Sequence, residues 1–196
     1  MAGKGSEIKI KKEYVILLVI LLLGAFVRFD GILREQPVQY HPDTWVIVGN
    51  AEKFANFDFT YNRPYSWPAA TLIHFYGIMF LFTKMFFPLT EYFAIRAVQI
   101  GNALIGTLSI LMVFIVGRKM FNTRTALIAS LLFSVMMDHM ILSRYETANS
   151  WAMFLMLLAL YFMYKFGFDR KEQTDAQQDS SFKVSGSGLK INKDLL

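Results

Sequence analysis

The chain has 196 residues, of which 55% are hydrophobic and only 18% are charged. A soluble domain carries about 25% charged residues, and the apolar residues here form long runs, so the composition favours a membrane protein. The absence of cysteine excludes disulfides, zinc–thiolate sites and thiol chemistry. The net charge of +5 forms no basic stripe, so we expect no nucleic-acid partner.

Four apolar runs predict an all-α, polytopic membrane protein with four transmembrane helices. The first run, at residues 14–29, is short for a span, but the lysines before it and Arg28 at its end can snorkel to the lipid headgroups. A secretory signal peptide is the alternative, although the run ends in a poor cleavage site. The other predicted spans are residues 97–117, 124–143 and 147–165.

A fifth apolar run, Ser66–Thr83, is long enough to cross the membrane, but charge argues against a crossing. With the lysine-rich N-terminus inside, an extra span would put both later basic turns outside, against the positive-inside rule. We therefore predict juxtamembrane helices at about 43–55 and 66–86 in a neutral outer loop. Residues 1–168 then form the transmembrane region. The polar tail at 169–196 predicts a flexible cytoplasmic linker, and its apolar end suggests a truncated chain.

Asp43 begins a predicted helix in the outer loop, directly after His41-Pro42. It is either a helix cap or a general base toward an incoming hydroxyl or amine. Helix N–H groups keep such a carboxylate ionised, which suits a base or a cation ligand. His41 is a candidate hydrogen-bonding residue at the substrate, and neither His41 nor His74 is expected to bind a metal.

The second candidate group lies in the short outer turn Ser143–Trp151. Glu146 and Asn149 are three residues apart and share a face if this turn is helical. Arg144 suits a phosphate because its planar fork donates several hydrogen bonds. An ordinary polar turn is the alternative for all three residues.

Two other charged residues are candidates. Arg63 precedes the second juxtamembrane helix, where it either contacts a lipid phosphate or is a solvated loop residue. Asp138 lies inside a predicted span, which makes it a site candidate by default. Its position near the outer end of the span equally allows simple solvation.

Several short motifs follow one another in a characteristic order. They are Arg28-Phe29, His41-Pro42-Asp43-Thr44, the aromatic segment Pro64–Phe82, Arg96-Ala97, Gly106-Thr107-Leu108, Gly117-Arg118-Lys119-Met120-Phe121, Ser143-Arg144-Tyr145 and Phe154–Phe162. From about Tyr14 to Tyr164 the chain thus resembles the N-terminal part of GT-C glycosyltransferases of the protein O-mannosyltransferase and lipid A aminoarabinose transferase type.

The resemblance implies a polytopic enzyme that uses a polyprenyl- or dolichyl-phosphate-linked sugar and a protein or lipid acceptor. Asp43 would be the catalytic base or would orient the acceptor, and transfer would occur on the extracytoplasmic side with inversion. The chain departs from the family at Thr44, where a second acid is common. The acid of the second turn aligns with Asn149, and Glu146 is one helical turn earlier, so either residue can hold that position.

The sequence therefore predicts a membrane glycosyltransferase, or its N-terminal fragment, with Asp43 and Glu146 as catalytic residues. Substrate contacts are expected from His41, Arg63, Arg144 and Asn149. The sequence identifies no cofactor, and a divalent cation is left open. The alternatives are a non-catalytic subunit or assembly factor that binds a partner through the outer loop, and a transporter fragment. The membrane would be the plasma membrane in a prokaryote and the endoplasmic reticulum in a eukaryote.

Overall fold

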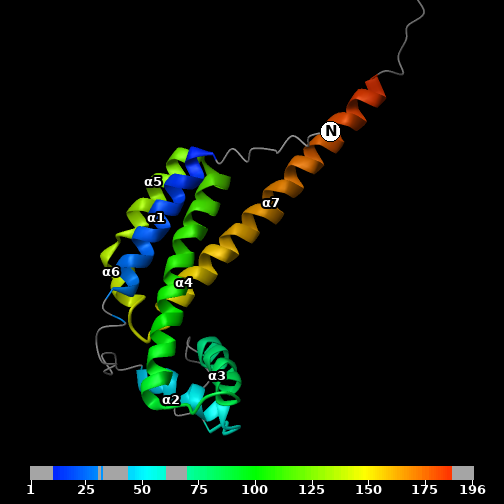
Figure 1. The fold of residues 1–196 in the computed structure, drawn as a ribbon. Coiled ribbons are helices and arrows are strands. Elements are labelled where there is room, and N and C mark those ends of the chain that lie inside the picture. The colour runs from blue at the N-terminus through cyan, green and yellow to red at the C-terminus, as the bar shows by residue number, and fades with distance from the viewer. Residues whose placement is uncertain (1–10, 31, 33–43, 61–69, 187–196) are drawn as a thin grey trace, which may run out of the picture. The chain divides into compact units, whose positions relative to one another are not determined.

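The computed structural model describes residues 11–30, 32, 44–60 and 70–186, with side chains as far as residue 167. All the regular elements in these ranges are helices, and none of the described residues forms a strand, which confirms the predicted all-α fold (Figure 1). The helices are α1 (Lys12–Phe29), α2 (Thr44–Ala55), α3 (Ala70–Lys84), α4 (Glu91–Met120), α5 (Thr123–Ser134), α6 (Met137–Leu142) and α7 (Asn149–Gly186). The chain divides into two compact units, Met1–Leu158 and Ala159–Leu196.

Helix α4 is the centre of the first unit, because α1, α2 and α5 all pack against it (Figure 1). It begins where the Thr90 side chain accepts a hydrogen bond from the Phe93 amide (3.2 Å), and Asn122 caps α5 in the same way. Glycine allows α1 to approach α4 closely: a Cβ on Gly24 would lie 2.2 Å from Ile110 Cδ1.

Helices α2 and α3 pair with each other and pack on α4. The core that they share with α4 consists of Ile47, Val48, Ala51, Ala55, Leu72, Tyr76, Phe80, Ala94, Ile95 and Val98. Gly77 of α3 faces the Phe54 ring of α2, where a Cβ would come within 2.6 Å. This contact packs the C-terminal part of α2 against α3.

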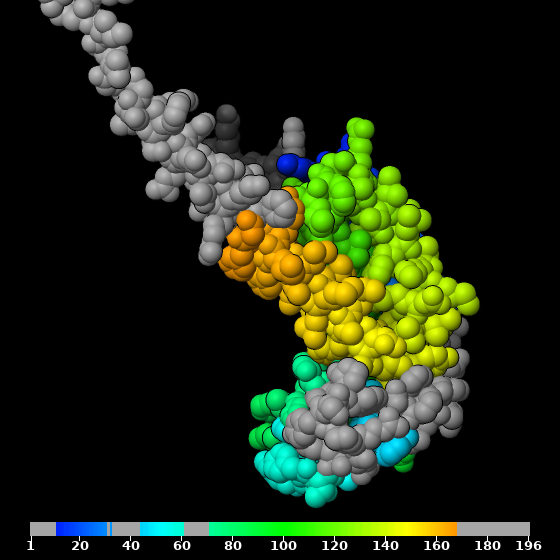
Figure 2. Space-filling model, turned by 180° about the vertical axis from the view of Figure 1, so that it is seen from behind, coloured from blue at the N-terminus to red at the C-terminus, as the bar shows by residue number. Residues whose placement is uncertain are grey.

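Among the described residues, two helical segments are long and apolar enough to cross a membrane, namely α4 and residues Asn149–Gly167 of α7. Apolar side chains also cover the outer faces of α1 and α5, where they include Leu18, Val19, Leu22, Ile128, Leu131 and Leu132. Figure 2 shows α5 and α6 (yellow-green) along one edge of the bundle. Outward-facing apolar surfaces of this kind are typical of helices that contact lipid.

The predicted span at 124–143 consists of two helices, since α5 ends at Ser134 and α6 begins at Met137. No proline or glycine causes this break. Instead, Arg28 Nη1 donates a hydrogen bond to the Ser134 carbonyl (2.9 Å), which a continuous helix would pair with a later backbone amide. A side chain inserted into the helical ladder is a recognised cause of such a break.

Helix α7 continues to Gly186, where the sequence predicted a flexible linker from residue 169. The segment between Gly167 and Gly186 contains neither glycine nor proline, the two residues that most disfavour a helix interior. Its polar composition therefore does not prevent helix formation.

Candidate functional site

The two outer motifs meet through one buried hydrogen bond. Thr44, the first residue of α2, donates through Oγ1 to Glu146 Oε2 at 2.8 Å, although the two residues are 102 positions apart. Both side chains are 0% exposed. The segment that begins with Asp43 in the sequence is therefore joined directly to the second outer turn.

The second carboxylate oxygen of Glu146 has no partner in the part of the chain that the structure describes. Glu146 Oε1 is buried without a hydrogen bond among the described residues, and so is the hydroxyl of Ser150 in the first turn of α7. A buried polar atom without a partner is costly. Glu146 Oε1 is thus an acceptor available to a hydroxyl, an amine or a cation.

Asn102 of α4 holds the turn that carries Glu146. Its Nδ2 donates to the carbonyls of Tyr145 (2.7 Å) and Thr147 (3.1 Å), which flank Glu146 in the chain. Its Oδ1 accepts from Tyr76 Oη (3.0 Å) and Trp151 Nε1 (2.9 Å). The one amide therefore ties α3, α4, the outer turn and α7 together.

Tyr76 is a neutral donor in this network. The side chain is 0% exposed, and burial raises the pKa of Tyr76 above its usual value. Its hydroxyl also lies 3.2 Å from the Val98 carbonyl. Gly101 makes room for the ring, because a Cβ there would lie 2.5 Å from Tyr76 Oη.

Two arginines clamp α1 to the segment around the outer turn. Arg144 donates through Nε (3.1 Å) and Nη2 (2.5 Å) to the Val27 carbonyl near the end of α1. The Arg28 guanidinium donates hydrogen bonds to the Ser134 carbonyl and to His139 Nδ1, each at 2.9 Å. The outer turn is therefore held from both α1 and α4.

Arg28 does not snorkel to the headgroups as predicted. It is 0% exposed and points into the bundle, where it also bonds its own helix at the Gly24 carbonyl (2.9 Å). Three acceptors inside the bundle hold the guanidinium there, namely the Gly24 and Ser134 carbonyls and His139 Nδ1.

The other predicted site residues have different outcomes. Asp43, His41 and Arg63 lie outside the described residues. Asn149 is exposed at the start of α7, and Glu146 precedes that helix, so the helical face that the two were expected to share does not form.

Asp138 and His74 take no part in the Thr44–Glu146 hydrogen bond. Asp138 is exposed in the first turn of α6. His74 packs edge-to-face on the Phe54 ring at 5.3 Å. Among the residues that the structure describes, no group of three His, Cys, Asp or Glu side chains could hold a metal ion.

Sequence reasoning missed Thr44 and Asn102 as parts of the site. Asn102 was visible as a polar residue inside the apolar run at 97–117, which is a signal for a functional or structural role. Its partners are 26 to 49 residues away, at Tyr76 and Trp151, and could not be read from the pattern.

Comparison with known families supports the interpretation drawn from the sequence. A family model described as dolichyl-phosphate-mannose-protein mannosyltransferase matches residues 75–174, which is just over half of the chain. Comparisons with curated proteins and with solved structures found no match. The family and the apolar helices together indicate a membrane protein with a glycosyltransferase-type function. The chain belongs to the dolichyl-phosphate-mannose-protein mannosyltransferase family.

Proposed function

We propose that this protein transfers a sugar from a polyprenyl- or dolichyl-phosphate donor to a protein or lipid acceptor on the extracytoplasmic face of a membrane. The family match supports the reaction class. The observation that carries the proposal is the Thr44–Glu146 hydrogen bond, because it joins the two outer motifs into one site.

The proposed topology has four crossings, formed by α1, α4, α5 with α6, and α7, and α3 stays outside. Charge supports this topology, because a crossing by α3 would put both later basic turns outside. A crossing by α3 would also put Thr44 and Glu146 on opposite sides of the membrane, which is incompatible with their 2.8 Å contact.

In the proposed reaction, Asp43 removes the proton from the acceptor hydroxyl or amine. The acceptor atom attacks the anomeric carbon, the bond from that carbon to the phosphate oxygen breaks, and the lipid phosphate leaves with inversion at the carbon. Glu146 contributes through both carboxylate oxygens. Oε2 accepts a hydrogen bond from Thr44, the residue after Asp43. Oε1, which has no partner among the described residues, accepts a hydrogen bond from the substrate or binds a cation.

Four other residues are proposed to contact substrate. Arg63 and Arg144 would bind the lipid phosphate, and His41 and Asn149 would bind the sugar or acceptor. Arg144 already bonds the Val27 carbonyl through Nε and Nη2. A guanidinium carries further N–H donors beyond these two, and they can serve a phosphate.

The experiment compares Asp43→Asn and Glu146→Gln with wild type in the complete enzyme, by transfer from a lipid-linked sugar. We expect Asp43→Asn to lower kcat by roughly 100-fold or more, as the loss of a general base does. Asp58→Asn is the matched control: Asp58 follows α2, and its carboxylate accepts hydrogen bonds from the amide and the hydroxyl of Thr60. Transfer by Asp43→Asn at the wild-type rate would sink the proposed mechanism.

A further inference from the structure

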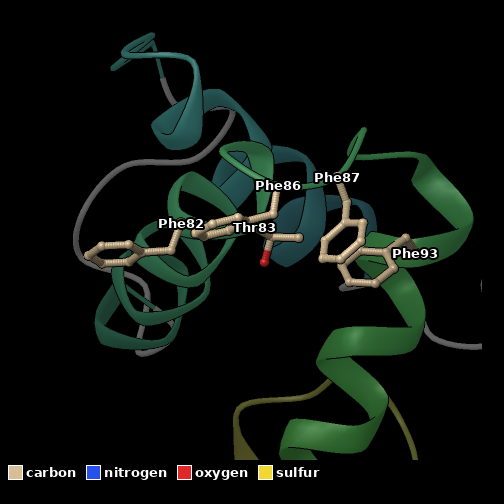
Figure 3. Close-up of a pocket in the computed structure, with 5 residues that line it drawn as sticks. All are labelled: Phe82, Thr83, Phe86, Phe87 and Phe93. Atoms are coloured by element: carbon tan, nitrogen blue, oxygen red, sulfur yellow. The ribbon is translucent and has the colours of Figure 1, made fainter.

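An aromatic pocket lies where α3 ends and α4 begins, away from the candidate site. It is open, has a volume of about 380 Å³ and is lined by Phe82, Thr83, Phe86, Phe87 and Phe93 (Figure 3). Its volume is within the range of roughly 300–1,000 Å³ that small-molecule sites occupy. The phenylalanine rings are largely uncovered by protein, with Phe86 74% exposed.

The backbone around this pocket is fixed by hydrogen bonds. The amides of Phe86 and Phe87 donate to the Thr83 carbonyl at 3.0 and 2.9 Å, and the Thr90 cap fixes the start of α4 beside Phe93. Thr83 Oγ1 donates to the Met79 carbonyl at 2.9 Å. The one hydroxyl of the lining thus already has a partner, and the pocket offers hydrocarbon and ring faces but no charge to hold a phosphate.

In the proposed topology, the length of α4 puts this pocket at the outer membrane interface. Arg118 marks the inner end of the apolar part of α4, and Phe93 is 25 residues earlier, so a rise of 1.5 Å per residue separates them by about 37 Å. The hydrocarbon core is roughly 30 Å thick and the whole bilayer about 40–45 Å. Phe93 therefore lies a few ångströms beyond the outer edge of the core, the depth at which aromatic residues gather.

We propose that this aromatic pocket binds an acyl chain of an outer-leaflet phospholipid and thereby anchors the α3–α4 turn at the membrane surface. Several phenylalanines exposed together would be unfavourable in water. A lining without charge does not select a sugar or a phosphate, whereas the acyl chains of outer-leaflet phospholipids begin a few ångströms deeper, within reach of the turn. The site is separate from the Thr44–Glu146 contact and does not depend on the proposed reaction.

Native mass spectrometry of the full chain, purified with phospholipid in mild detergent, tests the proposal. We expect wild type to retain one more phospholipid than Phe87→Ala. Tyr92→Ala is the matched control and should behave as wild type, because Tyr92 is similarly exposed and neighbours Phe93 but does not line the pocket. Phe82→Ala, on the α3 side of the pocket, should repeat the loss.

Two results would overturn the proposal. One is equal phospholipid retention by wild type, Phe87→Ala and Phe82→Ala. The other is a bound polyprenyl phosphate in place of phospholipid, which would assign the pocket to the donor lipid. Loss of folding is not expected to obscure either result, because Phe87 is 65% exposed and its truncation removes few contacts; circular dichroism of each variant checks this.

The depth of the turn provides an independent measurement. The chain has no cysteine, so Phe86→Cys can carry a single nitroxide in a lipid nanodisc. We expect oxygen to relax this label more than a water-soluble nickel chelate does, as at Leu104→Cys on an exposed face of α4. A label that matches the aqueous reference Asn122→Cys would contradict an anchored turn.

Discussion

At the residue scale, the site depends on the hydrogen bonds that the buried Glu146 carboxylate accepts. Glu146 has one hydrogen bond from Thr44 and one oxygen without a partner among the described residues. The sequence predicted Glu146 as a site residue because it is an acid in a short outer turn. It could not predict the bond from Thr44, because a contact between residues 102 positions apart depends on how the helices pack.

Thr44→Val leaves the Glu146 carboxylate without its hydrogen bond. We expect this change to lower the free energy of unfolding by about 1–3 kcal/mol, the cost of leaving a buried charged acceptor unpaired. In a Glu146→Leu background the same change should cost much less. Denaturant unfolding of the four variants in detergent measures the coupling, and strictly additive effects would show that the contact does not form.

Arg28→Met removes the donor that satisfies the Ser134 carbonyl and His139 Nδ1. Hydrogen bonds from a charged group contribute about 1.5–3 kcal/mol each, so we expect a loss of roughly 3 kcal/mol or more. Arg28→Lys should retain part of the stability that Arg28→Met loses. Thermal unfolding in detergent checks this, with exposed Arg124→Met as the control. Equal melting temperatures for Arg28→Met and Arg124→Met would contradict the role given to Arg28.

At the element scale, small residues determine how closely the helices approach. A Cβ on Gly106 of α4 would lie 2.6 Å from Ser143 Cβ and 3.2 Å from Arg28 Nε. The outer turn thus packs directly on the α4 backbone. The sequence contained these glycines within apolar runs, but which helix each one faces follows from packing alone.

Gly106→Ala should push the outer turn away from α4 and lower the melting temperature. Gly49→Ala in α2 should raise it slightly, because nothing lies within 4 Å of the added Cβ and alanine is favoured over glycine in a helix by up to about 1 kcal/mol. Differential scanning fluorimetry of both variants measures the contrast. The same shift for both would show that the turn does not pack against Gly106.

Most helices could be predicted because apolar runs and capping residues define them locally. Asn122 caps α5 next to its predicted start at residue 124, whereas α4, capped by Thr90, begins six residues before the predicted start at residue 97. The break after Ser134 could not be predicted, because it depends on Arg28 arriving from another helix. The helical continuation of α7 was missed because polar composition was taken as a sign of a linker.

At the scale of the whole molecule, the family match and the apolar helices support a membrane enzyme, and the proposed topology brings both outer motifs to one face. Charge distribution alone predicted that α3 does not cross. The Thr44–Glu146 contact supports the same topology from a different kind of evidence. The roles of Asp43, His41 and Arg63 stay predictions, because these residues lie outside the described ranges.

Single-cysteine accessibility tests this topology most directly, because the native chain has no cysteine. Cysteines replacing Asn56, Asn149, Asn122 and Ser180 would be treated with a membrane-impermeant thiol reagent in intact cells or sealed microsomes of known orientation. Asn149 is a better probe of the second outer turn than Ser143, which is fully buried.

The account predicts that the positions of Asn56 and Asn149 react from the extracytoplasmic side, and that those of Asn122 and Ser180 react only after permeabilisation. Reaction of the Asn56 and Asn149 positions from opposite sides would make α3 a true span. The two outer motifs would then face different compartments, and a site shared by Asp43 and Glu146 would be contradicted.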